Sequence, residues 1–429
     1  MQVIVEHGHV LMILALVLGF YMSWGIGAND VANAMGTSTG SGAVTVRQAI
    51  VIAAIFEFLG AFLAGGSVTA TIRSGIIDPQ SLAGTPEVLV FGMLAALVGA
   101  ALWLSVASWW GWPVSTSHTI VGGLVGFGVA AMGVDAVQWG MILTIVASWV
   151  VSPAVGGLLG YLLMMSVQLL ILRTRSPMRR ARAWGPVYVF LAGLIVSLVT
   201  LFKGLKHLNI DLSAPASLGL SALFALLLAG VAKILIDRTP VFPDASMEVQ
   251  FAMVEKAFAP MMLFAACAMA FAHGSNDVAN AIGPLAAVVS ILESGGSVVE
   301  TSAVPAWILA FGGAGIVIGL ATLGYRVMRT IGKSITTLTP SRGFCAILAA
   351  ASTVVLASKT GLPVSTTHIT VGAVLGVGMT GGIASINLGV LRGILLSWLI
   401  TVPAGAIIAI GFFFMFKGMF GVYCPPCAP

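Results

Sequence analysis

The sequence predicts an all-α, polytopic membrane protein whose two halves are inverted repeats of each other. Hydrophobic residues make up 59% of the 429 residues and charged residues only 8%, whereas charged residues are about 25% of a typical soluble domain. Apolar runs of about 20 residues, long enough to cross a bilayer, recur along the whole chain. Two distinctive motifs each occur twice, in the same order.

Uninterrupted apolar runs are expected to form single membrane spans, at about residues 9–27, 48–70, 87–108, 185–206, 216–236, 303–326 and 343–358. Two other stretches, 137–172 and 386–416, are too long for one span, and each contains a proline, Pro153 or Pro403. Because proline bends or ends a helix, we expect each stretch to form two spans or one bent pair.

The first repeated motif places an aspartate between two asparagines inside apolar sequence. It reads GANDVANAMG at residues 27–36 and GSNDVANAIG at residues 274–283. Asp30, Asp277 and Glu57 are the only acids inside the expected spans, where an unpaired carboxylate costs about 2.5–3.5 kcal/mol. No basic residue lies near these acids in the sequence, so we expect them to bind a cation or a proton.

The neighbouring amides favour sodium as that cation. Carboxylate and amide oxygens suit a hard cation, and interrupted membrane helices hold sodium with such oxygens beside free backbone carbonyls. The expected sodium ligands are Asn29, Asp30, Asn33, Asn276, Asp277 and Asn280. Glu57 is expected to be a coupling acid, and Arg392, in a late span, is a basic residue that could approach the acids in space.

The second repeated motif combines proline, hydroxyl side chains and histidine. It reads GWPVSTSHTIVG at residues 111–122 and GLPVSTTHITVG at residues 361–372. The segments 113–133 and 362–382 open on proline and are rich in glycine. We expect them to form re-entrant helical hairpins, which are tolerated at membrane depth where protein or water surrounds the backbone.

The hydroxyl side chains of the second motif predict an anion site. Proline favours a helix start, and the N-terminus of a helix supplies free N–H groups and positive dipole. Two such ends, meeting at a pseudo-twofold axis, would hold a tetrahedral oxyanion without a fixed positive charge. The expected donors are Ser115, Thr116, Ser117, Ser365, Thr366 and Thr367, with Asp30 and Asp277 beside the anion. His118 and His368 are expected to orient the hairpins.

Positive charges set the expected orientation of the chain. Arginines at positions 173, 175, 179, 180 and 182 indicate a cytoplasmic loop, and the lack of interleaved aromatic residues excludes a nucleic-acid site. The alternation of spans then places both termini outside. The chain runs inward around Asp30 and outward around Asp277, which is the arrangement of an inverted repeat and is typical of secondary transporters.

The repeats define the expected organisation of the chain. Residues 1–172 form the first repeat, 173–257 the basic loop with two connecting helices and a linker, 258–420 the second repeat and 421–429 a tail. The tail contains Cys424 and Cys427, which could bind a metal or form a disulfide, and the sequence leaves both interpretations open.

Both motif pairs resemble the signature sequences of the inorganic phosphate transporter (PiT) family, and the resemblance covers both halves of the chain. Segments 40–49, 55–57 and 71–78 also resemble that family, notably its sodium-coupled branch. The resemblance implies about 12 transmembrane helices and phosphate uptake driven by a sodium or proton gradient, with the aspartates and hairpin hydroxyls at the site. Position 347 differs from the family pattern, because this chain has isoleucine where many members carry glutamate. Any coupling role of that glutamate is therefore missing here or lies at another residue. The long hydrophilic central insertion of eukaryotic members is also absent, which points to a prokaryotic plasma membrane.

We therefore expect a secondary active transporter, not an enzyme, that imports inorganic phosphate with sodium by alternating access. The alternative is proton-coupled transport of phosphate, a metal–phosphate complex or sulfate; the aspartates favour phosphate, which carries a proton at neutral pH. An enzyme with serine nucleophiles would need its nucleophile once, whereas the hydroxyl clusters are duplicated. Binding residues that converge from both halves also suit an occluded site better than a continuous channel. No organic cofactor or nucleic-acid partner is expected beyond the lipid bilayer, and the oligomeric state stays open, a homodimer included.

Overall fold

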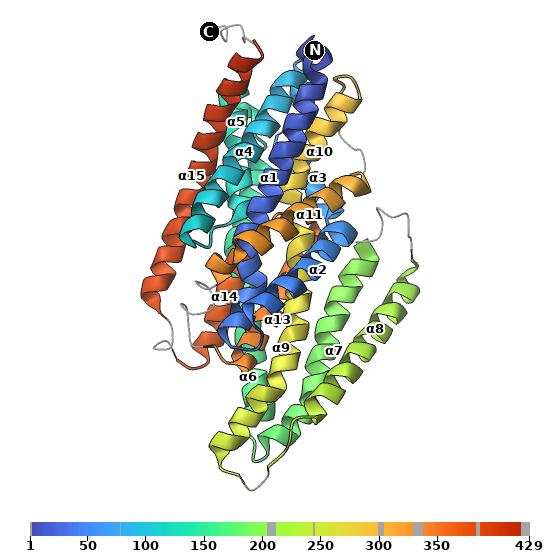
Figure 1. The fold of residues 1–429 in the computed structure, drawn as a ribbon, viewed down its shortest axis with the longest axis vertical. Coiled ribbons are helices and arrows are strands. Elements are labelled where there is room, and N and C mark those ends of the chain that lie inside the picture. Colours follow the sequence, from blue (N-terminus) through green and yellow to red (C-terminus); the bar gives the residue numbers. More distant parts are fainter. Residues whose placement is uncertain are drawn as a thin grey trace.

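The computed structural model describes residues 2–77, 79–203, 212–242, 245–298, 304–328, 338–382 and 387–421. Throughout these residues the regular structure is helical, apart from an isolated β-bridge between Ile77 and Val137. The helices form an elongated bundle (Figure 1), in which the start of the first helix and the end of the last lie together. The rings of His7 and Phe420 are 5.5 Å apart at that end. The predicted all-α architecture is confirmed.

The first half of the chain contains α1 (Gln2–Gly40), α2 (Val46–Ala64), α3 (Gly66–Ser74), α4 (Pro86–Trp110), α5 (Thr116–Met132) and α6 (Trp139–Val167). Two connecting helices follow, α7 (Pro177–Lys203) and α8 (Ala214–Asp237). The second half contains α9 (Met247–Asp277), α10 (Ala279–Glu293), α11 (Ala306–Thr322), α13 (Pro340–Thr360), α14 (Thr366–Met379) and α15 (Leu388–Met419). Short 3₁₀ turns lie at Pro79–Leu82 and Val134–Ala136, and a π-helical turn, Gln168–Leu172, extends α6.

Within the described ranges, nine helical segments are long and apolar enough to cross a membrane. They make this a multi-pass membrane protein. Three shorter apolar helices, α5, α11 and α14, are 17, 17 and 14 residues long. Two of these, α5 and α14, are the segments in which the sequence predicted hairpins.

The two long proline-containing stretches, expected to form two spans or one bent pair each, each form one continuous helical segment. Residues Trp139–Leu172 run without a break past Pro153, and Leu388–Met419 run past Pro403. A proline removes only one backbone hydrogen bond, and in a membrane bundle neighbouring helices can satisfy the carbonyl that loses its donor. The Pro153 carbonyl packs directly against Gly372 of α14, where a larger residue would clash.

The turns before α5 and α14 are alike. The helix α4 ends at Gly111 with φ +71°, and α13 ends at Gly361 with φ +75°, a left-handed conformation that favours glycine. A short extended link then leads to Ser115 or Ser365, whose side chain accepts a hydrogen bond from the backbone N–H three residues later. Ser115 and Ser365 therefore cap the two helices, so these two expected anion donors act as acceptors for the first helical turn.

Helix packing repeats between the two halves. The helix α1 packs on α11 and α4, while α9 packs on α2 and α13; likewise α5 packs on α15 and α14 on α6. Glycines allow these close approaches, because a side chain on Gly27 would meet the Ile316 carbonyl and one on Gly274 would meet the Glu57 carbonyl. Ile316 on α11 therefore occupies the position that corresponds to Glu57 on α2.

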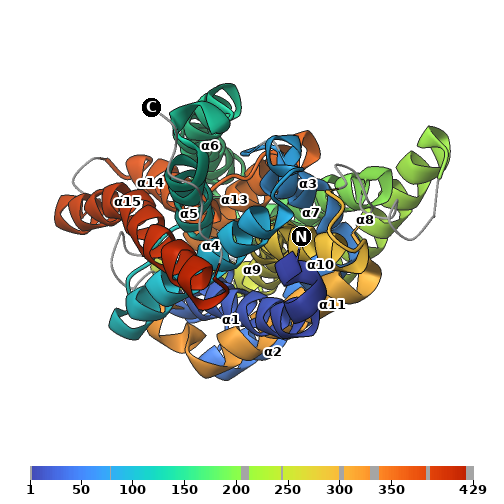
Figure 2. The ribbon, with the colours of Figure 1, turned by 90° about the horizontal axis from the view of Figure 1, so that it is seen from above.

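The helices α7 and α8 form a pair at the edge of the bundle. They pack on each other, and α7 joins the pair to α9. Figure 2 shows α8 on the opposite side of the molecule from α15. This position leaves the repeated helices to build the interior.

The close approach of α1 and α11 predicts the outcome of a glycine substitution. A Cβ at Gly319 would meet the Trp24 carbonyl, whereas Gly219 in α8 has open space around it. We expect Gly319→Ala to destabilise the protein by about 1–3 kcal/mol through overpacking. The matched control Gly219→Ala should be neutral or stabilising by about 0.5–1 kcal/mol. Thermal unfolding of both purified variants in detergent measures this, and equal unfolding temperatures would contradict the close packing.

Candidate functional site

The two aspartates of the first motif are buried next to the two helix starts of the second motif. Asp30 lies on α1 and is 1% exposed, and Asp277 ends α9 and is fully buried. The first copy of the motif lies inside a continuous helix, because α1 runs from Gln2 to Gly40. The second copy is interrupted at Val278, between α9 and α10.

Each aspartate accepts a hydrogen bond from the threonine that opens the hairpin helix of its own half. Thr116 Oγ1 donates to Asp30 Oδ2 at 2.8 Å, and Thr366 Oγ1 donates to Asp277 Oδ2 at 2.7 Å. These two contacts are equivalent under the duplication of the sequence. They bring the acids and the hydroxyls into one buried cluster, as the sequence predicts.

The asparagines connect this cluster within each half and between the halves. Asn29 donates to Ser108 Oγ and the Trp112 carbonyl, and Asn276 donates to Ser358 Oγ, so each contacts the end of the helix that precedes α5 or α14 in its own half. Asn33 and Asn280 instead reach across. Asn33 Nδ2 lies 2.9 Å from Thr367 Oγ1 and 3.5 Å from Thr366 Oγ1, and Asn280 Nδ2 lies 3.2 Å from both Thr116 Oγ1 and Ser117 Oγ.

The remaining hydroxyls tie the two helix starts together. Ser117 Oγ donates to the Val364 carbonyl at 3.0 Å, and Thr367 Oγ1 donates to the Val114 carbonyl at 3.2 Å. Ser115 and Ser365 are the N-caps described above. The hydroxyls of Thr116, Ser117, Thr366 and Thr367 therefore donate to protein acceptors in this structure, and an anion would have to compete for them.

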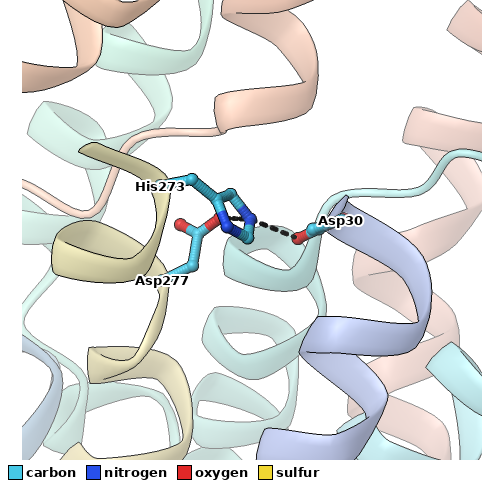
Figure 3. A group of neighbouring side chains, drawn as sticks. All are labelled: Asp30, His273 and Asp277. Atoms are coloured by element: carbon cyan, nitrogen blue, oxygen red, sulfur yellow. Dashed lines mark ion pairs between the residues drawn. The ribbon is translucent and has the colours of Figure 1, made fainter. Parts of the chain in front are cut away.

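His273 joins the cluster and was missed as a site residue from the sequence. Figure 3 shows its ring between Asp277 and Asp30. Its Nε2 lies 2.8 Å from Asp277 Oδ2, without hydrogen-bond geometry, and 3.9 Å from Asp30 Oδ2. Its Nδ1 is 2.8 Å from Glu57 Oε2. The expectation that no basic residue lies near the acids was wrong, because the spacing from His273 to Asp277, four residues, places both on one helix face.

The expected basic partner in a late span is not at the site. Arg392 lies exposed on α15, and the ion pairs of the three buried acids with described residues are all made by His273. Glu57, which the sequence predicts as a coupling acid, is fully buried and belongs to the cluster through His273. The three carboxylates thus share one imidazole.

The histidine and glutamate have no polar counterparts in the other repeat. The motif alignment pairs His273 with Ile26, and the helix packing pairs Glu57 with Ile316. Ile26 and Ile316 are both fully buried. The aspartates, asparagines and threonines are therefore duplicated, whereas the ionisable His273–Glu57 pair occurs on one side only.

The cluster has more acceptors than donors. Among the described residues, five buried carboxylate and amide oxygen atoms have no hydrogen-bond partner: Asp30 Oδ1, Glu57 Oε1, Asn276 Oδ1, Asp277 Oδ1 and Asn280 Oδ1. One atom each of Asp30, His273 and Asp277 lie within 4.8 Å of one another, close enough to surround a metal ion. With the carboxylates ionised, three negative charges face at most one positive charge, so the site can accept a cation or protons.

The two motif histidines lie apart from the aspartates. Their ring centroids are 4.3 Å apart in an edge-to-face arrangement. The His118 ring lies tilted against Trp149, with centroids 3.7 Å apart, and the His368 ring stacks on Trp398 at 3.4 Å. His368 Nδ1 is 3.3 Å from the Trp149 carbonyl. This four-ring cluster fills the space between the first turns of α5 and α14 and the helices α6 and α15.

Comparison with known proteins matches the chain along nearly its full length. A family model described as the phosphate transporter family matches residues 26–409. A protein of Haemophilus influenzae, described as a proposed phosphate permease, is 48% identical over 98% of this chain and 100% of its own length. The chloroplastic inorganic phosphate transporter 2-1 of Arabidopsis thaliana is 44% identical over 94% of this chain and 71% of its own length. A solved structure titled "The sodium-dependent phosphate transporter" superposes with a TM-score of 0.89 at 40% identity, covering 96% of this chain and all of that chain.

The one-sided His273–Glu57 pair predicts strong coupling between these two residues in stability. Replacing either with the isoleucine of the other repeat leaves a buried partner uncompensated, so Glu57→Ile and His273→Ile should each cost about 3–5 kcal/mol. The double variant should cost less than the sum of the two, by about 1 kcal/mol or more. Thermal unfolding of the four proteins completes the cycle, and strictly additive losses would show that the pair does not act as a unit.

Proposed function

The chain belongs to the phosphate transporter family, and from this membership we propose that it is a secondary active transporter that imports inorganic phosphate with sodium by alternating access. Family membership also confirms the expectation that the chain is not an enzyme. The single observation that carries the proposal is the excess of unpartnered buried oxygen atoms beside two capped helix starts. The unpartnered oxygen atoms suit a cation, and the capped helix starts suit an anion.

Sodium is the proposed coupling ion because the unpartnered acceptors are carboxylate and amide oxygens, which suit a hard monovalent or divalent cation. The proposed ligands are the six motif residues, namely Asn29, Asp30, Asn33, Asn276, Asp277 and Asn280. Asn29 Oδ1 accepts from the Val114 N–H and would have to share that donor. The name of the structural neighbour, a sodium-dependent transporter, supports the same ion.

Phosphate is proposed to bind at the starts of α5 and α14. The first-turn N–H groups of a helix have no acceptor within the helix and point toward the N-terminal end, where the dipole favours an anion. The hydroxyls of Ser115, Thr116 and Ser117, and of Ser365, Thr366 and Thr367, lie at these starts. Thr116 and Thr366 would exchange an aspartate for a phosphate oxygen, and an aspartate beside the anion can accept a proton from dihydrogen phosphate. Sulfate has no such proton.

Glu57 is proposed to act in coupling through His273. The carboxylate fixes Nδ1 of the imidazole at 2.8 Å, and Nε2 then faces both aspartates. A change in the charge at the aspartates therefore changes the electrostatic environment of Glu57. A proton-coupled transporter of phosphate, metal–phosphate or sulfate is the alternative, because the same unpartnered carboxylate oxygens can take protons.

The proposed architecture is an inverted repeat of about 12 membrane helices. In Figure 1 the pair α4 and α5 occupies the half of the bundle that holds the start of α1, and α13 and α14 occupy the opposite half, which supports two hairpins entering from opposite sides. We propose residues 1–172 and 258–420 as the two repeats. We also propose a prokaryotic plasma membrane with both termini outside, and a homodimer as an assembly compatible with the exposed helix faces.

Uptake in proteoliposomes tests the coupling ion. With sodium and proton gradients imposed separately, labelled phosphate should accumulate on an inward sodium gradient and not on a proton gradient in sodium-free medium. The physical reason is that the buried oxygens need a charge-balancing cation before the anion can enter. Equal accumulation on the proton gradient would overturn sodium coupling and establish the alternative.

The aspartates should be individually essential. Asp30→Asn and Asp277→Asn keep the side-chain shape but remove a charge that balances the cation, so each should lower sodium-driven uptake by at least about tenfold, the value of one charged hydrogen-bond contact. Asp135→Asn, which removes an exposed acid of the loop before α6, is the matched control and should transport normally. If either site variant takes up phosphate at the wild-type rate, with thermal unfolding unchanged, that aspartate is not part of the transport site.

A further inference from the structure

We propose that the junction of α7, α8 and α9 binds the headgroup of an anionic phospholipid. A cavity of about 120 Å³ opens there, between the start of α7 and the segment that leads into α9. Its polar lining comes from Ser176, Arg179 and Gln250, and its apolar lining includes Met178, Phe242 and Met253. A water molecule occupies about 30 Å³ in the liquid, so the space suits a group of a few heavy atoms, such as a phosphate.

The cavity lies where membrane and water meet. Three candidate membrane spans begin or end beside it, at Pro177, Asp237 and Met247. This junction is at the end of the bundle opposite the start of α1 (Figure 1). A phospholipid headgroup sits at this level of a bilayer, whereas a ligand of the aspartate cluster lies in the interior of the bundle.

The charge around the cavity is complementary to an anion. Arg175, Arg179 and Arg180 are exposed and make no ion pair with a described residue. Arg182, by contrast, is used within the fold, since it donates to the carbonyls of Asp237 and Thr239. Arg179 lines the cavity, and Arg175 and Arg180 are exposed close to it in the sequence. Guanidinium binds phosphate with two parallel hydrogen bonds.

The apolar rim favours a lipid over a free anion. Large side chains are exposed on the segment that leads into α9 and on its first turns: Phe242 is 51% exposed, Met247 46%, Val249 40% and Phe251 39%. Such residues cost free energy in water but gain it against acyl chains. Arginine clusters beside apolar surface at the cytoplasmic end of membrane helices are the pattern that binds anionic lipid headgroups.

Native mass spectrometry of the full-length protein tests this proposal. The protein is purified in detergent and mixed with equal amounts of phosphatidylglycerol and phosphatidylcholine. We expect the wild type to retain phosphatidylglycerol selectively. Each arginine removed should reduce this retention about fivefold, first in Arg179→Gln and again in the double variant Arg179→Gln/Arg180→Gln. The matched control is Arg47→Gln, which removes an exposed arginine at the start of α2 and should retain the lipid as the wild type does. Equal loss in the control, or no loss in the double variant, would overturn the site.

A second variant separates a lipid from free phosphate. Phe242→Ser removes an apolar side chain of the cavity wall and leaves every arginine in place, so retention of phosphatidylglycerol should fall about fivefold or more. Inorganic phosphate at millimolar concentration should not compete the lipid away. Unchanged lipid retention in Phe242→Ser, together with competition by inorganic phosphate, would replace the lipid with a soluble phosphate as the occupant. Thermal unfolding of each variant verifies that it is folded.

Discussion

The structure depends on the burial of Asp30 and Asp277 inside a membrane bundle. Carboxylates at that depth cost about 2.5–3.5 kcal/mol each unless partners satisfy them. The surrounding helices are arranged to supply those partners, namely two threonines at helix starts and one histidine on α9. Amides from both halves donate to threonine hydroxyls of the same cluster. The partners do not suffice, since one oxygen of each aspartate has no hydrogen bond with a described residue. A membrane site left with unsatisfied acceptors is suited to a charged ligand that can enter and leave.

The duplication of the sequence explains most contacts of this site, but the His273–Glu57 pair departs from the symmetry between the two halves. Symmetric contacts alone would make the two aspartates equivalent, and a ligand would then have no reason to prefer either. The His273–Glu57 pair, opposite Ile26 and Ile316, places the imidazole 2.8 Å from Asp277 and 3.9 Å from Asp30. The two carboxylates therefore differ in their electrostatic surroundings, and cation and anion can be expected to divide between them unequally.

Much of the site could be predicted from the sequence, because the duplicated motifs contain the aspartates, the asparagines and the helix caps. The fold class followed from composition, and the packing of short helices from proline and glycine. What the sequence could not provide is the register between helices far apart in the chain. Glu57 meets His273 only because Gly274 lets α9 lie against the backbone of α2. The continuity of α6 and α15 past proline, and the direction in which Ser117 and Thr367 donate, also depend on neighbours that no local pattern reveals.

The two hydrogen bonds between the helix starts bear on how such a site can open. Ser117 donates to the Val364 carbonyl and Thr367 to the Val114 carbonyl, so α5 and α14 cannot separate unless both bonds break. Neutral hydrogen bonds contribute about 0.5–1.5 kcal/mol each, hence this closure is worth about 1–3 kcal/mol. Moving a two-state equilibrium from 1:99 to 99:1 takes about 5.5 kcal/mol of differential binding. Hydroxyl bonds alone are thus too weak to decide between a closed and an open arrangement. The ring cluster of His118, Trp149, His368 and Trp398 beside them supplies further contact area that must also part. Because Thr116 and Thr366 at the same two helix starts donate to Asp30 and Asp277, a change in charge at the aspartates would act directly on these contacts.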